Sequence, residues 1–269
     1  MRSILLTQNA PTAYAVYSAR TLTELAELFG LETDHVYSKN EILEDSSKFE
    51  DVTYVFSTWG MPSFTKEEVG FFKSLKAVFY AAGSVQGFAR PFLESGIRVF
   101  SAWAANGVPV AEVTVAEIIL ANKGYHRAAL LCSSKAENRG ESIRFVRITR
   151  GNYGARVGVI GAGMIGSMVC NMLKNYNLEV VVFDPFCSEK KAESLGVKLV
   201  SLEELFETSE VITNHLANNA QTKGMLNYNL FSRMKDHATF INTGRGAQVV
   251  EADLVRALTE NRTERLSWT

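Results

Sequence analysis

One glycine-rich segment constrains the fold of this chain more than any other. Gly161, Gly163 and Gly166 are spaced as G-x-G-x-x-G within GAGMIG, directly after an apolar strand predicted at 156–160 and at the start of a helix predicted at 164–175. In this context the first glycine permits a tight turn, the second lets a pyrophosphate approach the backbone, and the third lets the helix pack on the strand. Free amides and the helix dipole favour phosphate charge there, so we expect a dinucleotide site.

An acidic residue follows at a suitable distance. Asp184 ends the apolar run 180–183 and lies 18 residues after Gly166 (184 − 166 = 18), close to the separation of about 20 residues expected for the acid that binds ribose hydroxyls. A carboxylate there repels a 2′-phosphate, and the next residues, Pro185 and Phe186, include no arginine to bind one. We therefore expect NAD rather than NADP. A glycine-rich turn with a solvated acid is the alternative interpretation.

Short apolar strands alternate with helices along the whole chain, which is typical of parallel sheets covered by helices. A long helix is expected at 109–129, because Pro109 suits a helix start, and the polar stretch 133–154 is expected to be an exposed connection. We predict two α/β domains, 1–106 and 107–269, with a boundary near 105–109. The predicted strands are 3–7, 52–56, 77–80, 97–100, 156–160, 178–183, 211–214 and 238–241; the other predicted helices are 22–29, 66–72, 88–94, 164–175, 202–207 and 251–258.

A second signal surrounds Arg245, which stands between Gly244 and Gly246 just after the strand predicted at 238–241. Ligands of open α/β sheets bind beyond the carboxyl ends of the strands. A guanidinium stays protonated and can hold a carboxylate in two-point geometry. We interpret Arg245 as an anion-binding residue; a surface arginine in a glycine-rich turn is the alternative.

Composition excludes several classes of protein. The 269 residues include 28 Lys and Arg against 29 Asp and Glu, so no basic excess predicts a nucleic-acid or membrane partner. The three cysteines are odd in number and lack C-x-x-C spacing, which argues against a disulfide framework or a metal site and favours a reducing compartment. Without a signal peptide or 18 consecutive apolar residues, we expect a cytoplasmic protein.

Together these segments resemble the D-isomer-specific 2-hydroxyacid dehydrogenase family over most of the chain. Residues 81–85 are similar to the family's substrate-carboxylate loop, and residues 106–112 to its hinge and the start of its interdomain helix. Residues 242–246, followed by 249–258, are the most specific similarity.

The resemblance implies a flavodoxin-like substrate domain at 1–106 and a Rossmann-type, doubly wound NAD-binding domain at 107–269. It implies hydride transfer between the nicotinamide of NAD and C2 of a 2-hydroxy or 2-keto acid, with the protein supplying orientation, electrostatics and a proton relay. The substrate would lie in the cleft between the domains, and such enzymes are usually homodimers.

The resemblance also implies roles for individual residues. Arg245 would orient the substrate carboxylate and carbonyl beside the amides of Gly83 and Ser84. Trp59 and its neighbours would shape the substrate pocket, although a packed aromatic without that role is an equal alternative. The full implied sets are Gly83, Ser84, Thr58, Trp59 and Gly60 for the substrate, and Gly161, Gly163, Met164, Ile165, Gly166, Asp184, Asn106, Thr243 and Gly244 for the cofactor.

The chain departs from the family pattern in its histidines and its tail. The family's catalytic Glu and His lie downstream of the arginine segment, whereas this chain stops at Thr269. None of the four histidines has the family's Pro-His context, and we interpret them as solvated or hydrogen-bonded, although His215 follows a strand and could approach the nicotinamide. Ala217 stands where many relatives carry proline. The four histidines are His35, His126, His215 and His237.

The tail at 261–269 lacks the apolar strand that the family has there, and a frameshift after the codon of Asn261 would account for it. We therefore expect an NAD domain that is C-terminally incomplete, without its later strands, and weak or absent turnover. A dinucleotide-binding protein without chemistry, such as a regulator or an inactive remnant, stays open. A methyltransferase using S-adenosylmethionine is disfavoured because it has no use for the substrate loop or Arg245.

Overall fold

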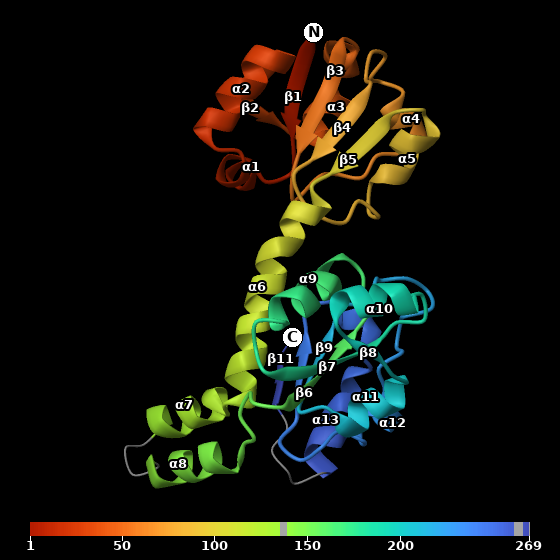
Figure 1. Cartoon of the computed structure of the whole chain (residues 1–269). Helices are drawn as coiled ribbons and strands as arrows, with labels where there is room; N and C mark the ends of the chain where they lie inside the picture. The colour runs from red at the N-terminus through yellow and green to blue at the C-terminus, as the bar shows by residue number, and fades with distance from the viewer. Residues whose placement is uncertain (135–138, 261–265, 269) are drawn as a thin grey trace. The chain divides into compact units, whose positions relative to one another are not determined.

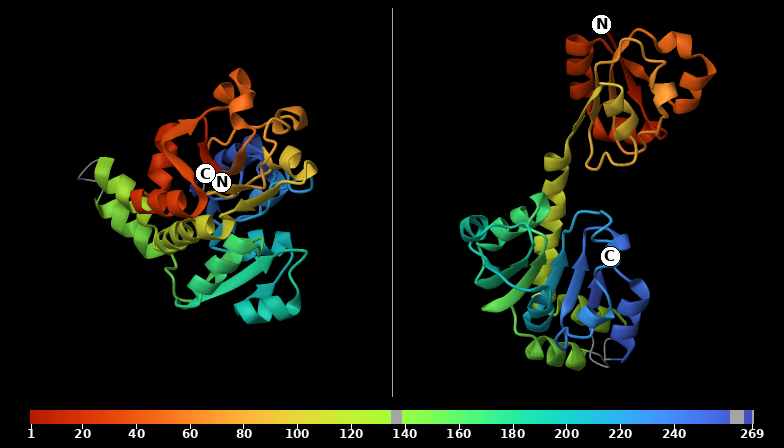
Figure 2. Two further views of the ribbon diagram at one scale, coloured as in Figure 1. Left: turned by 90° about the horizontal axis from the view of Figure 1, so that it is seen from above. Right: turned by 90° about the vertical axis from the view of Figure 1, so that its right-hand side faces the viewer.

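The chain forms two compact α/β units, Met1–Asn106 and Gly107–Thr269, called unit 1 and unit 2 below. The structure is a computed structural model that describes residues 1–134, 139–260 and 266–268. Figures 1 and 2 show a sheet with helices in each unit.

Unit 1 is built on a parallel sheet of five strands. Their order is β2-β1-β3-β4-β5, which is the flavodoxin-like order and confirms the expected fold class. In this order β2 lies on one side of β1 and the later strands β3, β4 and β5 lie on the other, so the strand order reverses between β1 and β3. The strands are β1 (Arg2–Leu6), β2 (Leu31–Tyr37), β3 (Val52–Ser57), β4 (Ala77–Tyr80) and β5 (Arg98–Ser101).

Helices cover both faces of this sheet because successive side chains of a strand point to opposite faces. Leu5 and Phe56 are buried with the helices of one face, and Ile4, Leu6 and Val55 with those of the other. The first face carries α1 (Ala10–Val16) and α2 (Ala19–Phe29); the second carries α3 (Lys39–Glu44), the 3₁₀ turn η1 (Ser46–Phe49), α4 (Lys66–Val69) and α5 (Ala89–Glu94).

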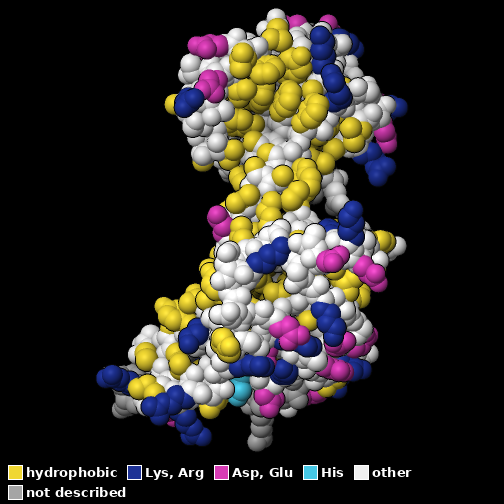
Figure 3. Space-filling view, in the orientation of Figure 1, with side chains coloured by type: hydrophobic (Ala, Val, Ile, Leu, Met, Phe, Trp, Pro, Cys, Tyr) yellow, Lys and Arg dark blue, Asp and Glu magenta, His cyan; other side chains and the backbone are white. Residues whose placement is uncertain are grey.

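An aromatic row crosses the first face of the sheet. The ring centroids of Phe56 and Phe79 lie 5.1 Å apart, and those of Phe79 and Phe100 lie 5.2 Å apart, both pairs stacked. Phe100 on the edge strand β5 stays 47% exposed, and Figure 3 shows hydrophobic side chains gathered over this unit. The row therefore runs from the core of unit 1 to a partly solvated edge.

Unit 2 is built on a parallel sheet of six strands in the order β11-β10-β9-β6-β7-β8. Numbered within the unit, this is the 3-2-1-4-5-6 order of dinucleotide-binding sheets, and it confirms the Rossmann-type prediction. The expectation that the sheet lacks its later strands is wrong for the sixth position, because β11 pairs parallel with β10. The strands are β6 (Ala155–Ile160), β7 (Leu178–Phe183), β8 (Lys198–Leu199), β9 (Val211–Asn214), β10 (Thr239–Asn242) and β11 (Leu266–Trp268). Of the unusual tail, residues 261–265 and 269 lie outside the described residues.

Two cores hold this sheet between its helices. Helices α6, α9 and α10 pack on one face, and α11, α12 and α13 on the other. The helices are α6 (Trp103–Asn122, which begins in unit 1), α7 (Tyr125–Ser134), α8 (Arg139–Ile148), α9 (Met164–Leu173), α10 (Glu189–Leu195), α11 (Leu202–Thr208), α12 (Tyr228–Phe231) and α13 (Glu251–Glu260), with a 3₁₀ turn η3 (Gly246–Gln248).

Helix α6 differs from its prediction. It begins at Trp103, so Pro109 lies inside it, and it ends before Gly124, whose φ of +65° a helix does not accept. The expected helix at 109–129 is therefore wrong at both ends. By length and composition alone α6 could cross a membrane, but its Ala111 and Ile118 are buried in the core of unit 2.

The stretch 133–154 is not a simple connection. It contains α8, which lies beside α7, and its Phe145 is buried with the Arg127 guanidinium 4.8 Å from the ring centroid. Phe145 and Ser142, whose hydroxyl donates to the Ala128 carbonyl of α7, are the buried residues of this helix. Strand β2 and helices α1 and α3 were also missed, because β2 is a largely polar edge strand and the two helices are short.

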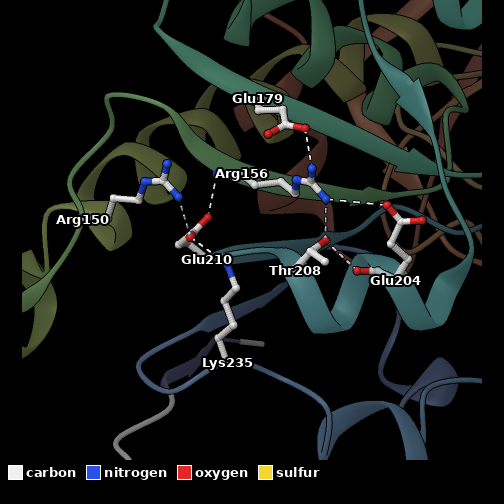
Figure 4. Close-up of polar contacts among 7 residues, drawn as sticks. All are labelled: Arg150, Arg156, Glu179, Glu204, Thr208, Glu210 and Lys235. Carbon is white, nitrogen blue, oxygen red and sulfur yellow. Dashed lines mark hydrogen bonds and ion pairs between the residues drawn. The ribbon is translucent and has the colours of Figure 1, made fainter.

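A cluster of ions ties together the amino ends of the strands in unit 2 (Figure 4). Glu210 accepts the Arg156 backbone N–H at 2.6 Å and pairs with Lys235 at 2.9 Å and Arg150 at 3.4 Å. The Arg156 guanidinium lies 2.6 Å from Glu179. Burial alone would raise the pKa of Glu210, but bonds from Lys235 and Arg156 lower it below its ordinary value. This cluster links the amino ends of the strands, whereas the glycine motif lies at the opposite, carboxyl end of β6.

Candidate functional site

The glycine motif lies at the carboxyl end of β6, where the strand order of unit 2 reverses between β6 and β9. Gly161 has a φ of +89°, which favours glycine, and its N–H donates to the Phe183 carbonyl at the end of β7, at 2.8 Å. A Cβ on Gly161 would lie 3.1 Å from the His215 carbonyl oxygen, just after β9. The turn is therefore packed between the ends of two neighbouring strands.

The other two glycines differ in the space around them, since Gly166 is closely packed and Gly163 is open. A Cβ on Gly166 would lie 1.9 Å from the Gly161 carbonyl oxygen, so only glycine fits there. A Cβ on the exposed Gly163 would meet no described atom within 4 Å. Gly163 also precedes α9, whose amino end has no side-chain cap within the described chain. Open space beside free helix amides fits a diphosphate, so the residues present suit a dinucleotide.

Asp184 is fixed against this turn. Its Oδ2 accepts the Ala162 N–H at 2.7 Å, and its Oδ1 accepts the Phe186 N–H at 2.8 Å. Ala162 is also held through its carbonyl oxygen, which accepts hydrogen bonds from Lys191 Nζ at 2.5 Å and from Ser167 Oγ at 2.8 Å. The structure therefore brings the glycine turn and the predicted ribose-binding carboxylate together.

Buried amide side chains support the loop that carries Arg245. Asn214 Nδ2, at the end of β9, donates to Asn242 Oδ1 at 2.9 Å and to Gln248 Oε1 at 2.7 Å. Gln248 Nε2 donates to the Leu216 carbonyl at 2.8 Å. Asn214 and Gln248 are fully buried, and a buried polar group is costly unless it is hydrogen-bonded, so these bonds specify the loop.

Arg245 itself is presented to solvent by this scaffold. Its backbone N–H donates to Gln248 Oε1 at 3.2 Å, and its Nη1 donates to the Gly244 carbonyl at 2.8 Å. A Cβ on Gly244 would lie 2.7 Å from Gln248 Oε1 and 2.8 Å from Asn214 Nδ2, so a larger residue there would displace the amide side chains that hold the loop. A fixed backbone with an exposed guanidinium suits the binding of a carboxylate.

The segment after β9 separates the two loops. The His215 N–H donates to the Ile160 carbonyl at 2.8 Å, on the side of the glycine turn. The His215 ring lies between Thr213 Oγ1, 3.0 Å from Nε2, and Thr243 Oγ1, 3.2 Å from Nδ1. Burial lowers the pKa of His215 to about 4, so its ring is neutral near pH 7.

The predicted substrate residues of unit 1 gather at the carboxyl edge of its own sheet. Gly60 has a φ of +92°, and a Cβ there would lie 2.6 Å from Thr7 Oγ1, at the end of β1. Thr7 Oγ1 in turn donates to the Trp59 carbonyl at 2.9 Å, and Thr58 Oγ1 donates to the Ala81 carbonyl at 3.3 Å. Thr58–Gly60 therefore lie where the strand order of unit 1 reverses, and the Trp59 side chain is half exposed.

The predicted carboxylate loop is held next to them. Ser101 Oγ donates to the Gly83 carbonyl at 2.7 Å, and a Cβ on Gly83 would lie 3.1 Å from Asn106 Nδ2. Ser84 is exposed. Asn106 thus lies beside the substrate loop within unit 1, and its role toward a cofactor stays a prediction.

The predicted residues therefore form one group in each unit. In unit 2 the structure joins the glycine turn, with Met164 and Ile165 in the first turn of α9, to Asp184, and it places Thr243–Arg245 across the His215–Leu216 segment. Sequence reasoning missed the supporting residues Asn214 and Gln248. An amide side chain at the end of the short predicted strand 211–214 was the available signal for Asn214.

The remaining histidines make other contacts. His35 Nε2 lies 2.7 Å from Glu41 in unit 1, and His126 Nε2 lies 2.8 Å from Glu117. The His237 ring packs edge-on against Phe145. Their interpretation as solvated or hydrogen-bonded side chains agrees with these contacts.

Comparison with protein families gives a match over residues 126–267 to the model described as D-isomer specific 2-hydroxyacid dehydrogenase, NAD binding domain. This match confirms the resemblance inferred from the sequence motifs, and it covers more than half of the chain.

Two curated relatives illustrate the similarity. D-3-phosphoglycerate dehydrogenase of Archaeoglobus fulgidus is 30% identical over 222 residues, covering 82% of this chain and 40% of the relative. A 2-hydroxyacid dehydrogenase homolog of Haemophilus influenzae is 32% identical over 169 residues, covering 63% of this chain and 49% of the relative. The chain thus spans less than half the length of either protein.

Solved structures share the fold. The holo form of D-mandelate dehydrogenase from Rhodotorula graminis superposes with a TM-score of 0.81 at 14% identity, covering 99% of this chain and 87% of that one. The apo form of D-lactate dehydrogenase from Escherichia coli gives 0.69 at 23% identity, covering 98% and 81%.

The partly buried His215 ring, whose desolvation lowers its pKa, predicts a pH effect on stability. The unfolded chain takes up a proton here as the pH falls through 6.5, whereas the folded chain does so only near 4. The stabilisation of the neutral form is therefore fully present above pH 6.5 and is lost as the pH falls toward 4, by roughly 2–4 kcal/mol in total. Urea unfolding of the parent chain and His215→Gln from pH 7.5 to 4.5 should show the parent losing stability relative to the variant. His35→Gln is the control, and a constant difference between parent and His215→Gln would contradict the prediction.

Proposed function

Because the chain belongs to the D-isomer specific 2-hydroxyacid dehydrogenase family, we propose that it binds NAD at the glycine turn of unit 2 and orients a 2-hydroxy or 2-keto acid with Arg245. The observation that carries the proposal is the 2.7 Å hydrogen bond from the Ala162 N–H to Asp184. It holds a ribose-binding carboxylate beside a turn that is open at Gly163.

Each part of the NAD-binding loops has a distinct task. The amides at the amino end of α9 stabilise the diphosphate charge. Asp184 accepts hydrogen bonds from ribose hydroxyls and disfavours a 2′-phosphate, which supports NAD over NADP. When bound, NAD supplies or accepts the hydride exchanged with C2 of the acid.

The substrate is held by its charge. Arg245 donates two parallel hydrogen bonds to the acid's carboxylate, a geometry that lysine does not reproduce. We assign the Gly83 and Ser84 amides to the same carboxylate, and Thr58–Gly60 to the substrate side chain. These roles follow the family resemblance and the place of each residue at a strand end.

Neither Arg245 nor His215 is suited to transfer a proton to the substrate. Arg245 stays protonated, so it orients the acid without exchanging a proton. His215, the histidine beside the Arg245 loop, is neutral, partly buried and bonded to two threonines. We therefore propose weak turnover for the 269-residue chain, and these contacts of His215 favour a dinucleotide-binding protein without chemistry as the second candidate.

We also propose a homodimer and a cytoplasmic location. Three consecutive helices of unit 2 expose large apolar side chains, namely Val113 of α6, Leu130 of α7 and Ile143 of α8, and Figure 3 shows hydrophobic side chains over α6 and α7. Patches of this kind mark association surfaces. The three cysteines are unpaired, which suits a reducing compartment.

The glycine turn gives a separable test of NAD binding. We expect Gly163→Val to abolish NADH binding while leaving the melting temperature unchanged, because the added side chain meets only the space assigned to the diphosphate. Gly166→Ala should instead lower the melting temperature, because its Cβ collides with the Gly161 carbonyl. NADH fluorescence titration and thermal unfolding check both. Normal NADH affinity in a folded Gly163→Val chain would reject the site.

Turnover separates the two candidate functions. NADH oxidation with pyruvate, hydroxypyruvate, phenylpyruvate and 2-oxoisocaproate should stay well below the 1–10³ s⁻¹ common among enzymes. Any residual activity should be lost in Arg245→Gln with NADH affinity retained, because Arg245 holds the acid rather than the cofactor. Activity within the common range would refute the proposed weakness, and activity that survives Arg245→Gln would refute the role of the arginine.

The dimer can be tested on its exposed helices. Leu130→Glu combined with Ile143→Glu should convert a dimer to a monomer in sedimentation velocity, because a charge opposes burial of that surface. Leu28→Glu is the matched control, since Leu28 is as exposed as Leu130 but lies in unit 1. A parent chain that sediments as a monomer would rule out the dimer.

A further inference from the structure

A chain of hydroxyl groups and one imidazole, buried at Thr114 and Thr213 and partly buried at His215 and Thr243, connects three elements of unit 2. Thr213 and His215 lie at the end of β9, Thr243 follows β10, and Thr114 belongs to α6. The contacts are Thr213 Oγ1 to His215 Nε2 at 3.0 Å, His215 Nδ1 to Thr243 Oγ1 at 3.2 Å, Thr243 Oγ1 to Thr114 Oγ1 at 3.4 Å, and Thr114 Oγ1 to the Val110 carbonyl at 2.7 Å.

The direction of every hydrogen bond in this chain follows from its last member. A carbonyl only accepts, so Thr114 donates its single proton to Val110. Thr114 can then only accept from Thr243, which uses the Thr243 proton. Thr243 must in turn accept from His215, so Nδ1 carries the proton, and the bare Nε2 accepts from Thr213. The backbone of α6 thereby selects one tautomer of a histidine on another element.

The place of the chain gives it a role in the site. Thr114 and Thr213 are fully buried, so an unmatched donor or acceptor here would be costly. Thr243 directly precedes Gly244 and Arg245 in the loop that the amide side chains of Asn242 and Gln248 support. Those amides hold the loop on the side of β9 and η3, and the hydroxyl chain holds it on the side of α6.

We propose that His215 is a positioning residue for Arg245: as the Nδ1–H tautomer it links Thr213 to Thr243 and fixes the start of the arginine loop against helix α6. The role of Arg245 toward an acid rests on the proposed function, whereas the tautomer and the fixed loop do not.

The first test reads the imidazole directly. Nitrogen-15 NMR of the full chain should show His215 protonated at Nδ1 and bare at Nε2 near pH 7. In Thr114→Val the Thr243 hydroxyl loses its acceptor and turns to donate to Nδ1, so the proton should move to Nε2 in a measurable share of molecules. Thr259→Val is the matched control, because Thr259 also donates at 2.7 Å to the carbonyl four residues before it but lies on the exposed face of α13.

The second test reads the loop. In Thr243→Val, amide hydrogen exchange at Gly244 and Arg245 should become about two- to tenfold faster, the range expected for losing one hydrogen bond. Thr243→Ser keeps the hydroxyl and should restore the slow exchange. With NADH bound, the affinity for oxamate, a 2-keto acid analogue, should fall and recover in the same two variants.

The outcomes separate this inference from the proposed function. Protonation at Nε2 in the parent chain, or exchange at Gly244 and Arg245 that is equal in Thr243→Val and the parent, overturns the positioning role. A tautomer unchanged by Thr114→Val overturns the control by α6. Failure of the parent chain to bind NADH rejects the proposed function, while the nitrogen and exchange data still decide the role of His215.

Discussion

The hydrogen bond from the Ala162 amide to Asp184 is the contact on which the proposed dinucleotide site depends. It forms because β6 and β7 are parallel neighbours whose carboxyl ends lie side by side. A residue that ends β7 therefore meets the turn that ends β6. With Lys191 and Ser167 on the Ala162 carbonyl, the peptide groups of the turn are fixed before any ligand arrives. Preorganisation of this kind lowers the cost of binding.

The arginine loop depends on a different principle. Asn214 and Gln248 are buried completely, which is unusual for amide side chains. Their hydrogen bonds to Asn242, Leu216 and the Arg245 backbone satisfy them and leave the loop few alternative conformations. A short loop with two glycines would otherwise be mobile. The buried amide side chains thus fix the backbone from which the exposed Arg245 guanidinium projects.

The errors of the sequence analysis have physical causes. Helix α6 continues through Pro109, and its buried apolar residues Ala111, Val115 and Ile118 hold the part of the helix after the proline in the core of unit 2. Helix α8 forms because Phe145 packs against Gly124 and Arg127, a partnership that no local periodicity displays. Strand β2 is polar because it lies at a sheet edge. In each case a tertiary contact outweighs the local preference.

Local pattern by itself determined the alternation of strands and helices, the α/β class and the position of the glycine turn for which we propose phosphate binding. These features depend on residues close in the chain, such as Gly161, Gly163 and Gly166 after an apolar strand. Only the tertiary structure decided that Thr213 and Thr243 meet at His215, that Thr114 contacts Thr243, and that Asn214 supports Gln248. Apart from the local Thr213–His215 contact, these contacts join residues 28, 34 and 129 positions apart, and only the completed sheet brings such distant residues together. The glycine motif predicts where the site lies in the sequence, and the packing of the sheet determines which side chains surround it.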